Sequence, residues 1–117
     1  MEKKKGGCHC GKVRYEVELD LTAPVIECNC SICSGHGLLL SFAPDEHMNI
    51  AQGEENLTEY RFNKEKIAHS FCKTCGVEVF GKGSNSEGVP TYAVNMRTLD
   101  DIDVTTLNRM PYDGKAL

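Results

Sequence analysis

The chain has 117 residues, of which 26% are charged and 40% hydrophobic, and its formal net charge is −4 at pH 7. This composition is that of an ordinary soluble protein, and the length fits a single domain covering residues 1–117. It argues against a disordered chain, a membrane protein and a nucleic-acid reader, because there is no apolar run of about 18 residues and no basic excess.

The first residues carry charge but no apolar stretch behind it, which predicts no secretory signal. The lysine run at 3–5 is interpreted as a solvated tail rather than a phosphate-binding segment. We therefore expect a cytoplasmic protein, and in that compartment cysteines serve metal binding or catalysis more often than disulfides.

The first half of the chain predicts two strands. Residues 13–19 alternate strictly between apolar and charged or polar side chains, which is typical of a half-buried strand, and turn residues follow at 20–24. The apolar run 38–42 predicts a second strand that is buried on both faces. Pro44 and the acidic residues after it favour a single helical turn, and 51–55 predicts a polar turn.

The second half predicts further strands separated by short connections. Segments 58–62 and 67–71 alternate and form an expected hairpin around 63–65. The remaining expectations are strands at 77–80 and 91–94, a loop at 81–88, and a short turn or helix within 100–108. No segment has a long helical period, so the sequence predicts an all-β fold of roughly six to eight short strands with cysteines in the turns.

The seven cysteines fall into three tight clusters: Cys8 and Cys10; Cys28, Cys30 and Cys33; Cys72 and Cys75. An odd number cannot be used entirely in disulfides, and cysteines this close in sequence rarely bridge without strain. The same spacings suit thiolates that converge on tetrahedral zinc. Seven ligands divide into four, which close a structural site, and three, which leave one coordination position open for chemistry.

Spacing alone does not decide which clusters combine. The middle cluster, Cys28, Cys30 and Cys33, offers three thiolates within six residues and is the best candidate for an open site that binds a small thiol. A second structural zinc, completed by His36 or His69, is the main alternative, and three free cysteines are a further one.

The four histidines have different expected places. His9 lies between two expected ligands and should be exposed, and His47 is interpreted as an ordinary surface residue. His36 follows the middle cluster on a flexible loop and could line the open site. A structural role is favoured for His69.

The ordered motifs resemble those of the glutathione-dependent formaldehyde-activating enzyme family, a domain also found in centromere protein V. The matching segments are GGCHCGKVRY at 6–15, ECNCSIC at 27–33, YRFN at 60–63, HSFCKTCG at 69–76, VNMRTLD at 94–100 and YDG at 112–114. The resemblance implies an Mss4-like fold with two zinc ions, one structural at Cys8, Cys10, Cys72 and Cys75, and one catalytic at Cys28, Cys30 and Cys33.

The activity that the resemblance implies is condensation of glutathione, or a similar thiol, with formaldehyde or another small aldehyde. The product is S-hydroxymethylglutathione, and the reverse reaction is that of a carbon–sulfur lyase. Candidate residues for the carboxylates of the thiol are Lys12, Arg14, Arg61 and Arg97, although solvated surface positions explain each of them more simply. The alternative is a non-enzymatic zinc module for partner binding or metal buffering, which predicts a closed middle site.

Overall fold

The computed structural model describes residues 1–61 and 67–113, and its architecture is all-β, as predicted. One short helix, α1 (Ser31–His36), accompanies ten strands in these residues. The strands are β1 (Glu2–Gly7), β2 (Arg14–Leu19), β3 (Val25–Cys28), β4 (Leu40–Pro44), β5 (Met48–Gln52), β6 (Leu57–Tyr60), β7 (Ala68–Cys72), β8 (Glu78–Ser84), β9 (Pro90–Asn95) and β10 (Arg109–Tyr112). Four single 3₁₀ turns are η1 (Asp45–His47), η2 (Glu54–Asn56), η3 (Met96–Thr98) and η4 (Val104–Thr106).

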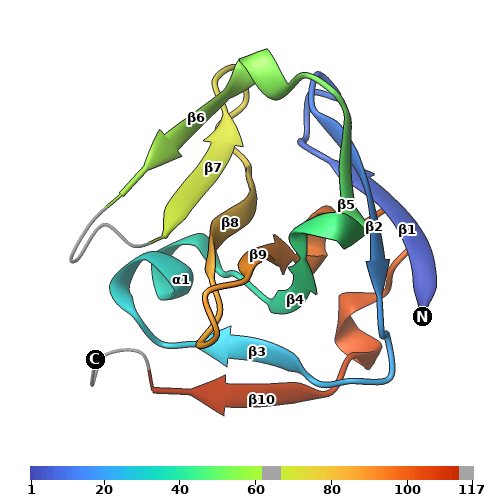
Figure 1. The fold of residues 1–117 in the computed structure, drawn as a ribbon, viewed down its shortest axis with the longest axis vertical. Helices are drawn as coiled ribbons and strands as arrows, with labels where there is room; N and C mark the ends of the chain where they lie inside the picture. Colours follow the sequence, from blue (N-terminus) through green and yellow to red (C-terminus); the bar gives the residue numbers. More distant parts are fainter. Residues whose placement is uncertain (62–66, 114–117) are drawn as a thin grey trace.

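The strands form two sheets. The smaller has the order β1-β2-β5, and the larger has the order β10-β3-β4-β9-β8-β7-β6. All neighbours are antiparallel except β10 and β3, which run parallel. In Figure 1 the small sheet stands on the right, while the larger sheet runs from β10 and β3 at the bottom to β6 and β7 at the upper left.

The core lies between the two sheets and is built by alternating residues. In β2 the side chains of Tyr15, Val17 and Leu19 are buried, which confirms the strand predicted at 13–19. The Phe80 ring packs edge-on against Tyr92, with ring centroids 4.9 Å apart, and Tyr15 also contacts Phe80 edge-on. Aromatic pairs of this geometry contribute about 0.5–1.5 kcal/mol beyond the area that they bury.

Most of the other predicted elements are confirmed within the described residues. Strands are found near 58–62, 67–71 and 91–94, and the single turns expected after Pro44 and within 100–108 are η1 and η4. The hairpin connection predicted at 63–65 lies outside the described residues. No helix in the described part of the chain has the length and apolar character needed to cross a bilayer.

Four strands, namely β1, β3, β5 and β10, and the helix were not predicted. The lysine run is no tail, because β1 pairs along its whole length with β2. Exposed lysines on an edge strand are a usual protection against aggregation, so charge there does not argue against a strand. The segments of β5 and α1 are too short to show a period. Every residue of β10 is exposed, so its sequence has no alternation between buried and exposed positions.

Two predicted segments differ from the structure in extent or burial. The loop expected at 81–88 starts later, because β8 continues to Ser84 through its glycines. The strand at 38–42 is not buried on both faces, because Phe42 remains 58% exposed. Its ring lies over an open groove described below.

Gly53 joins β5 to η2 with a backbone that only glycine adopts easily. Its φ is +83°, and a Cβ there would overlap the carbonyl oxygen of Lys12 and approach the Val13 Cα to 2.8 Å. We expect Gly53→Ala to cost about 2–3 kcal/mol, since positive φ alone costs about 1–2 kcal/mol and the clash is with backbone. In thermal unfolding this corresponds to a loss of about 10 °C or more.

The matched control for this prediction is Gly88→Ala. Gly88 has nearly the same φ of +80°, but nothing lies within 4 Å of its would-be Cβ. It should therefore show only the backbone cost of about 1–2 kcal/mol. Equal losses of stability in the two variants would contradict the argument that a Cβ at position 53 clashes with the Lys12 backbone.

Candidate metal centres and the surrounding groove

The first and third cysteine clusters come together in space. Cys8 and Cys10 lie in the turn between β1 and β2, and Cys72 and Cys75 lie at the turn between β7 and β8. The four Sγ atoms all lie within 4.8 Å of one another. The Sγ of Cys10 is 3.5 Å from that of Cys8 and 3.6 Å from that of Cys72. Zn–S bonds of about 2.3 Å would place tetrahedral sulfurs about 3.8 Å apart, so this donor set fits a metal ion.

Local backbone geometry directs amides toward these sulfurs. Gly11 and Gly76 both have positive φ, at +82° and +79°, which lets each turn fold back after its cysteines. The amides of Val13 and Thr74 donate to the Sγ of Cys8 and Cys72, each at 3.3 Å, and the Asn56 side-chain amide donates to Cys72 at 3.2 Å. Such donors favour thiolates, the form that binds metals.

The electrostatics at Cys72 agree with this geometry. Burial alone raises the pKa of the Cys72 thiol, but hydrogen bonds from the backbone amides of Cys75 and Thr74 outweigh it and lower the pKa to about 6. A thiolate is therefore favoured at neutral pH even before a cation is considered. We call Cys8, Cys10, Cys72 and Cys75 the four-cysteine cluster.

The middle cysteines form a second group, the three-cysteine cluster. Cys28 ends β3, Cys30 is the N-cap of α1, and Cys33 lies within that helix, so a strand end and a helix start point their sulfurs together. Their Sγ atoms all lie within 4.8 Å of one another, and among the described residues no further His, Cys, Asp or Glu joins them. The amides of Cys30 and Cys33 donate to the Sγ of Cys28 and Cys30, at 3.4 and 3.5 Å.

The three sulfurs differ in their surroundings. Cys33 is buried with Leu38 and Leu40 in a small cluster separate from the main core, whereas Cys28 and Cys30 are half-buried. Burial raises the pKa of the Cys33 thiol, and its contact with Cys30 adds to this. Burial also opposes ionisation of Cys30, but the amide of Cys33 and neighbouring donors lower its pKa overall. The half-buried side of the cluster is thus the side on which an external molecule could reach a bound metal.

Strand β10 holds the loop that carries this cluster. It pairs in parallel with β3, and the Asn29 amide donates to the Tyr112 carbonyl at 3.1 Å. The Asn29 side chain also donates to the Asp113 carboxylate at 2.9 Å. The positions of Cys28 and Cys30 therefore depend on residues near the other end of the described chain, since Asn29 and Asp113 are 84 positions apart.

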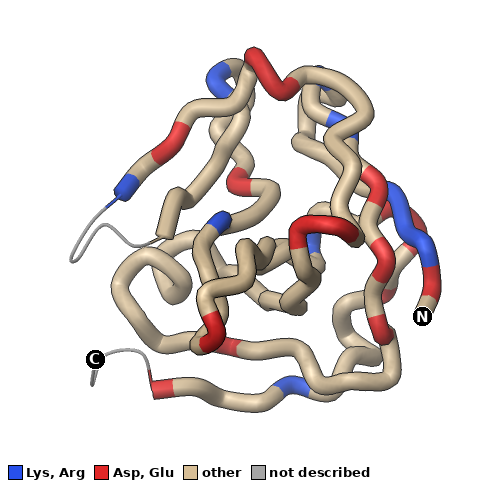
Figure 2. The backbone as a smooth tube through the Cα atoms, viewed as in Figure 1, with Lys and Arg blue, Asp and Glu red and all other residues tan. Residues whose placement is uncertain are grey.

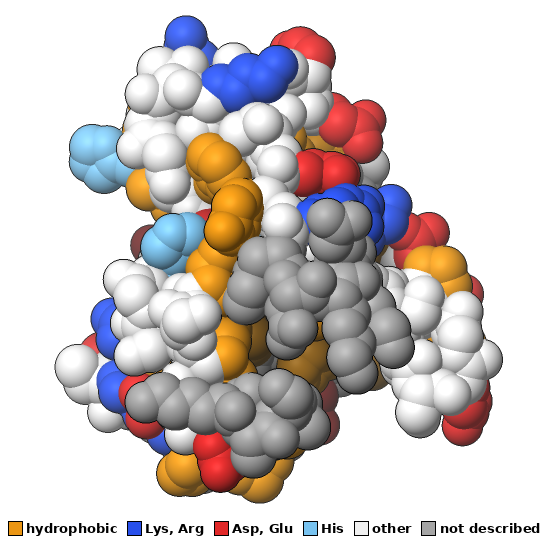
Figure 3. Space-filling view, turned by 90° about the vertical axis from the view of Figure 1, so that its left-hand side faces the viewer, with side chains coloured by type: hydrophobic (Ala, Val, Ile, Leu, Met, Phe, Trp, Pro, Cys, Tyr) orange, Lys and Arg blue, Asp and Glu red, His pale blue; other side chains and the backbone are white. Residues whose placement is uncertain are grey.

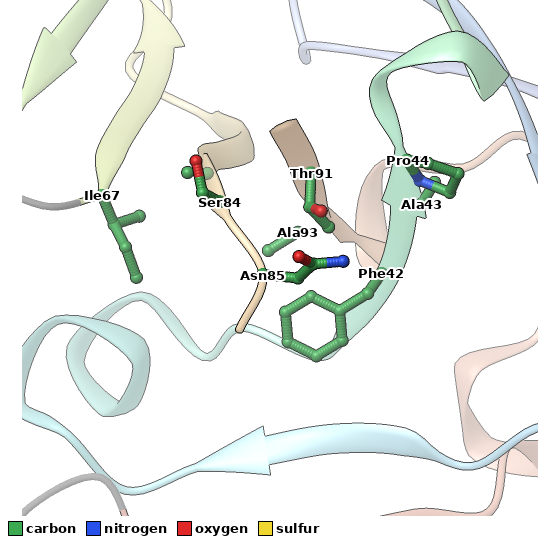
Figure 4. Close-up of a pocket in the computed structure, with 10 residues that line it drawn as sticks. Phe42, Ala43, Pro44, Ile67, Ser84, Asn85, Thr91 and Ala93 are labelled. Atoms are coloured by element: carbon green, nitrogen blue, oxygen red, sulfur yellow. The ribbon is translucent and has the colours of Figure 1, made fainter. Parts of the chain in front are cut away.

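A groove of about 480 Å³ lies on the sheet face formed by β4, β9 and β8. In Figure 4 the Phe42 side chain and Ile67 stand on opposite sides of it, with Ala93 and Thr91 of β9 between them. None of the described residues that line it is charged. Ala93 also packs against the small core that contains Cys33, so the groove adjoins the three-cysteine cluster. In Figure 3, hydrophobic side chains form a band down the middle of the face shown, with histidine side chains beside it.

Glu78 is a site residue that the sequence analysis missed. Its side chain is 1% exposed and accepts hydrogen bonds from Nδ1 of His36 at 2.8 Å and from Nδ1 of His69 at 3.0 Å. The signal in the sequence was a single acidic residue inside the apolar run 77–80. His69 is buried, while His36 ends α1 instead of lying on a loop.

The other two histidines lie elsewhere. His9 is exposed, as predicted. His47 is not an ordinary surface residue, because it is half-buried and its enclosed Nδ1 has no hydrogen-bond partner among residues 1–61 and 67–113. Neither contributes to the two cysteine clusters.

The sequence profile of the glutathione-dependent formaldehyde-activating enzyme family matches residues 3–111. The chain belongs to this family. A crystal structure of a Rhodobacter sphaeroides protein is similar to the chain with a TM-score of 0.80 and 34% identity, over 92% of this chain and 97% of that one. The predicted Mss4-like arrangement of small sheets around cysteine clusters is therefore confirmed for this family member.

A relative from Halomonas elongata carries the family name provisionally, as a glutathione-dependent formaldehyde-activating enzyme. It is 29% identical over 79 residues, which is 61% of this chain. The match spans only 50% of the length of that relative.

The cations that were candidates for binding the thiol's carboxylates separate into two groups in this family member. Arg14 pairs with Asp100, and Lys12 contacts Thr74 beside the four-cysteine cluster. Arg61, which follows β6, pairs with Glu59 of that strand at 3.4 Å. Arg97 lies on the three-cysteine side of the molecule, since its Nε donates to the Gly37 carbonyl at the end of α1 at 2.9 Å. Elsewhere Lys and Arg are scattered over the backbone, with the clearest run on β1 (Figure 2).

Proposed function

We propose that the chain is a zinc-dependent enzyme that forms and breaks a carbon–sulfur bond between a small thiol and a small aldehyde. The three-cysteine cluster is the proposed catalytic site, and the four-cysteine cluster is the proposed structural site. The observation that carries the proposal is the difference in donor number, with four thiolates at one group and three at the other among the described residues. Glutathione and formaldehyde are the substrates that the family description suggests.

Zinc at Cys28, Cys30 and Cys33 would supply a coordination position that holds a substrate sulfur as its thiolate at neutral pH. The chain's own residues prepare that position. The amides of Cys30 and Cys33 donate to ligand sulfurs and spread their negative charge. The half-buried Cys28 and Cys30 leave a side of the cluster open to substrate, and the buried Cys33 anchors it in the small core.

The surroundings suit the two substrates differently. The exposed Arg97, next to the end of α1, is the proposed partner for a carboxylate of the thiol, because guanidinium binds carboxylates in a paired geometry. The uncharged groove beyond Ala93 suits an aldehyde, including one larger than formaldehyde. The seven free cysteines support the proposed cytoplasmic location.

The alternative, a module that only binds a partner or stores metal, requires a closed middle site. It would need a fourth protein ligand such as His36 or His69. Among the described residues, neither histidine belongs to the group of converging ligand atoms at Cys28, Cys30 and Cys33. The observations therefore favour the enzyme.

The test uses the full chain loaded with zinc. We expect two metal equivalents by elemental analysis, binding of glutathione by calorimetry, and faster exchange between glutathione, formaldehyde and their adduct in exchange NMR. S-Methylglutathione is the matched control, because it keeps both carboxylates and lacks the thiol that the metal would bind. The proposal is wrong if the loaded protein neither binds glutathione nor changes the exchange rate.

A further inference from the structure

Glu78, His36 and His69 form a polar group that the proposed chemistry above does not use. The carboxylate is almost completely buried, and each of its oxygens faces the Nδ1 of a different imidazole, at 2.8 Å for His36 and 3.0 Å for His69. A buried carboxylate is costly unless its oxygens are hydrogen-bonded, so these two contacts are what make the position tolerable.

A β-bulge brings Glu78 to this face of the sheet. The pairing of β7 with β8 runs through Ser70 and Phe80 and then shifts, so that Phe71 lies opposite Glu78 instead of Val79. Because side chains alternate along a strand, the shift moves Glu78 to the face that carries Phe71 and His69. The Asn95 side chain of β9 then donates to the Glu78 carbonyl at 2.9 Å and fixes the backbone there.

The hydrogen bonds determine where the imidazole protons lie. An ionised carboxylate only accepts hydrogen bonds, so the Nδ1 atoms that face it must both donate. In a neutral His36 ring with its proton on Nδ1, Nε2 carries the lone pair. The carboxylate therefore sets the tautomer and the orientation of this ring, as carboxylates do for functional histidines in general.

His36 is the member of this group that a substrate can reach. Its side chain is 42% exposed, whereas those of His69 and Glu78 are 8% and 1% exposed. It ends the helix that carries Cys33 one turn earlier, and residues three apart on a helix are neighbours on its surface. His36 thus stands beside the three-cysteine cluster without belonging to its converging ligand atoms.

We propose that Nε2 of His36 transfers the proton in thiol addition, and that Glu78 and His69 are its positioning residues; this rests on the proposed function. Nε2 takes the proton of the thiol S–H, and the sulfur electron pair forms the C–S bond to the carbonyl carbon. The C=O π pair moves to oxygen, which receives the proton back from Nε2. Thiol and aldehyde give the hydroxyalkyl thioether with no proton, oxidant or reductant left over, and the reverse steps break it down.

The experiment compares the zinc-loaded protein with His36→Gln, Glu78→Gln and His69→Gln. The first readout is independent of activity: long-range ¹H–¹⁵N spectra of the imidazoles should show Nδ1–H tautomers for His36 and His69, and Glu78→Gln should disturb both. Metal content should stay at two equivalents in all three variants.

The second readout is the rate of exchange between glutathione, formaldehyde and their adduct. We expect kcat to fall about 100-fold in His36→Gln and about 10- to 100-fold in Glu78→Gln, with KM within about 3-fold of wild type. His47→Gln and Glu59→Gln, which change a histidine and a carboxylate away from this group, should behave as wild type.

Three results would overturn the inference. One is loss of a metal equivalent in His36→Gln, which would make His36 a ligand. Another is an Nε2–H tautomer in the wild type. The third is an active wild type with an equally active His36→Gln, a variant at an exposed position that should fold even if Glu78→Gln does not. A wild type that leaves the exchange rate unchanged overturns the proposed function itself.

Discussion

Replacing Cys72 with serine should leave the chain without a cooperatively folded state at 25 °C. Cys72 is completely buried, and its Sγ accepts hydrogen bonds from Asn56 and Thr74 while it contacts Cys10, 62 positions away. The cluster joins the β1–β2 turn to the β7–β8 turn, and so connects the small sheet to the large one. Structural zinc binds with about 10–16 kcal/mol in small domains, which is as large as the whole stability of a typical protein.

The measurement is metal content together with thermal unfolding and the dispersion of the amide NMR spectrum. Cys72→Ser should lose the four-cysteine metal and show a collapsed spectrum, and a strong chelator should do the same to the wild type. Serine is nearly isosteric with cysteine, so steric change cannot explain the loss. A Cys72→Ser protein that keeps two metals and a cooperative transition would contradict the structural assignment.

Cys30→Ser should have the opposite profile, with the fold retained and the activity lost. Cys30 caps α1, because its side chain accepts from the Cys33 amide, and serine is among the preferred N-cap residues. The helix start should therefore survive, at a cost of about 1 kcal/mol or less. A metal bound by the three-cysteine cluster would lose one of its three thiolates, and we expect adduct exchange to fall to the rate without protein.

The readouts are one metal equivalent in place of two, a thermal midpoint within about 8 °C of wild type, and no acceleration of exchange. Ser31→Ala is the matched control, since Ser31 is the exposed neighbour in the same helix and carries no metal ligand. Global unfolding of Cys30→Ser would move the middle cluster to a structural role and remove the basis for the proposed reaction.

The strands with strict alternation and the cysteine clusters could be predicted from the sequence, because both signals are local. The alternation of apolar and polar residues in β2 shows which of its side chains are buried. Cysteines two or three positions apart can bind the same ion, so their spacing predicts a shared site. The sequence spacing did not show that the cluster with Cys8 combines with the cluster with Cys72. Only the resemblance to a known family predicted that combination.

The remaining features depend on partners that are distant in the sequence. The strand character of β1 comes from β2, and that of the wholly exposed β10 comes from β3. The face of the sheet on which the Glu78 side chain lies depends on a one-residue register shift between β7 and β8. The alternation of residues within β8 alone does not reveal this shift. A six-residue helix such as α1 is too short to show a period of 3.6.

The parallel pairing of β10 with β3 also sets the order in which the molecule can be completed during synthesis. Translation is vectorial, and segments fold as they become available. All four ligands of the four-cysteine cluster have been made once Cys75 is added, so this connection between the sheets can form early. The loop carrying Cys28 and Cys30 waits for Tyr112 and Asp113 before its last hydrogen bonds exist. A nascent chain can therefore bring the four-cysteine cluster together before the last hydrogen bonds of the loop that carries Cys28 and Cys30 can form.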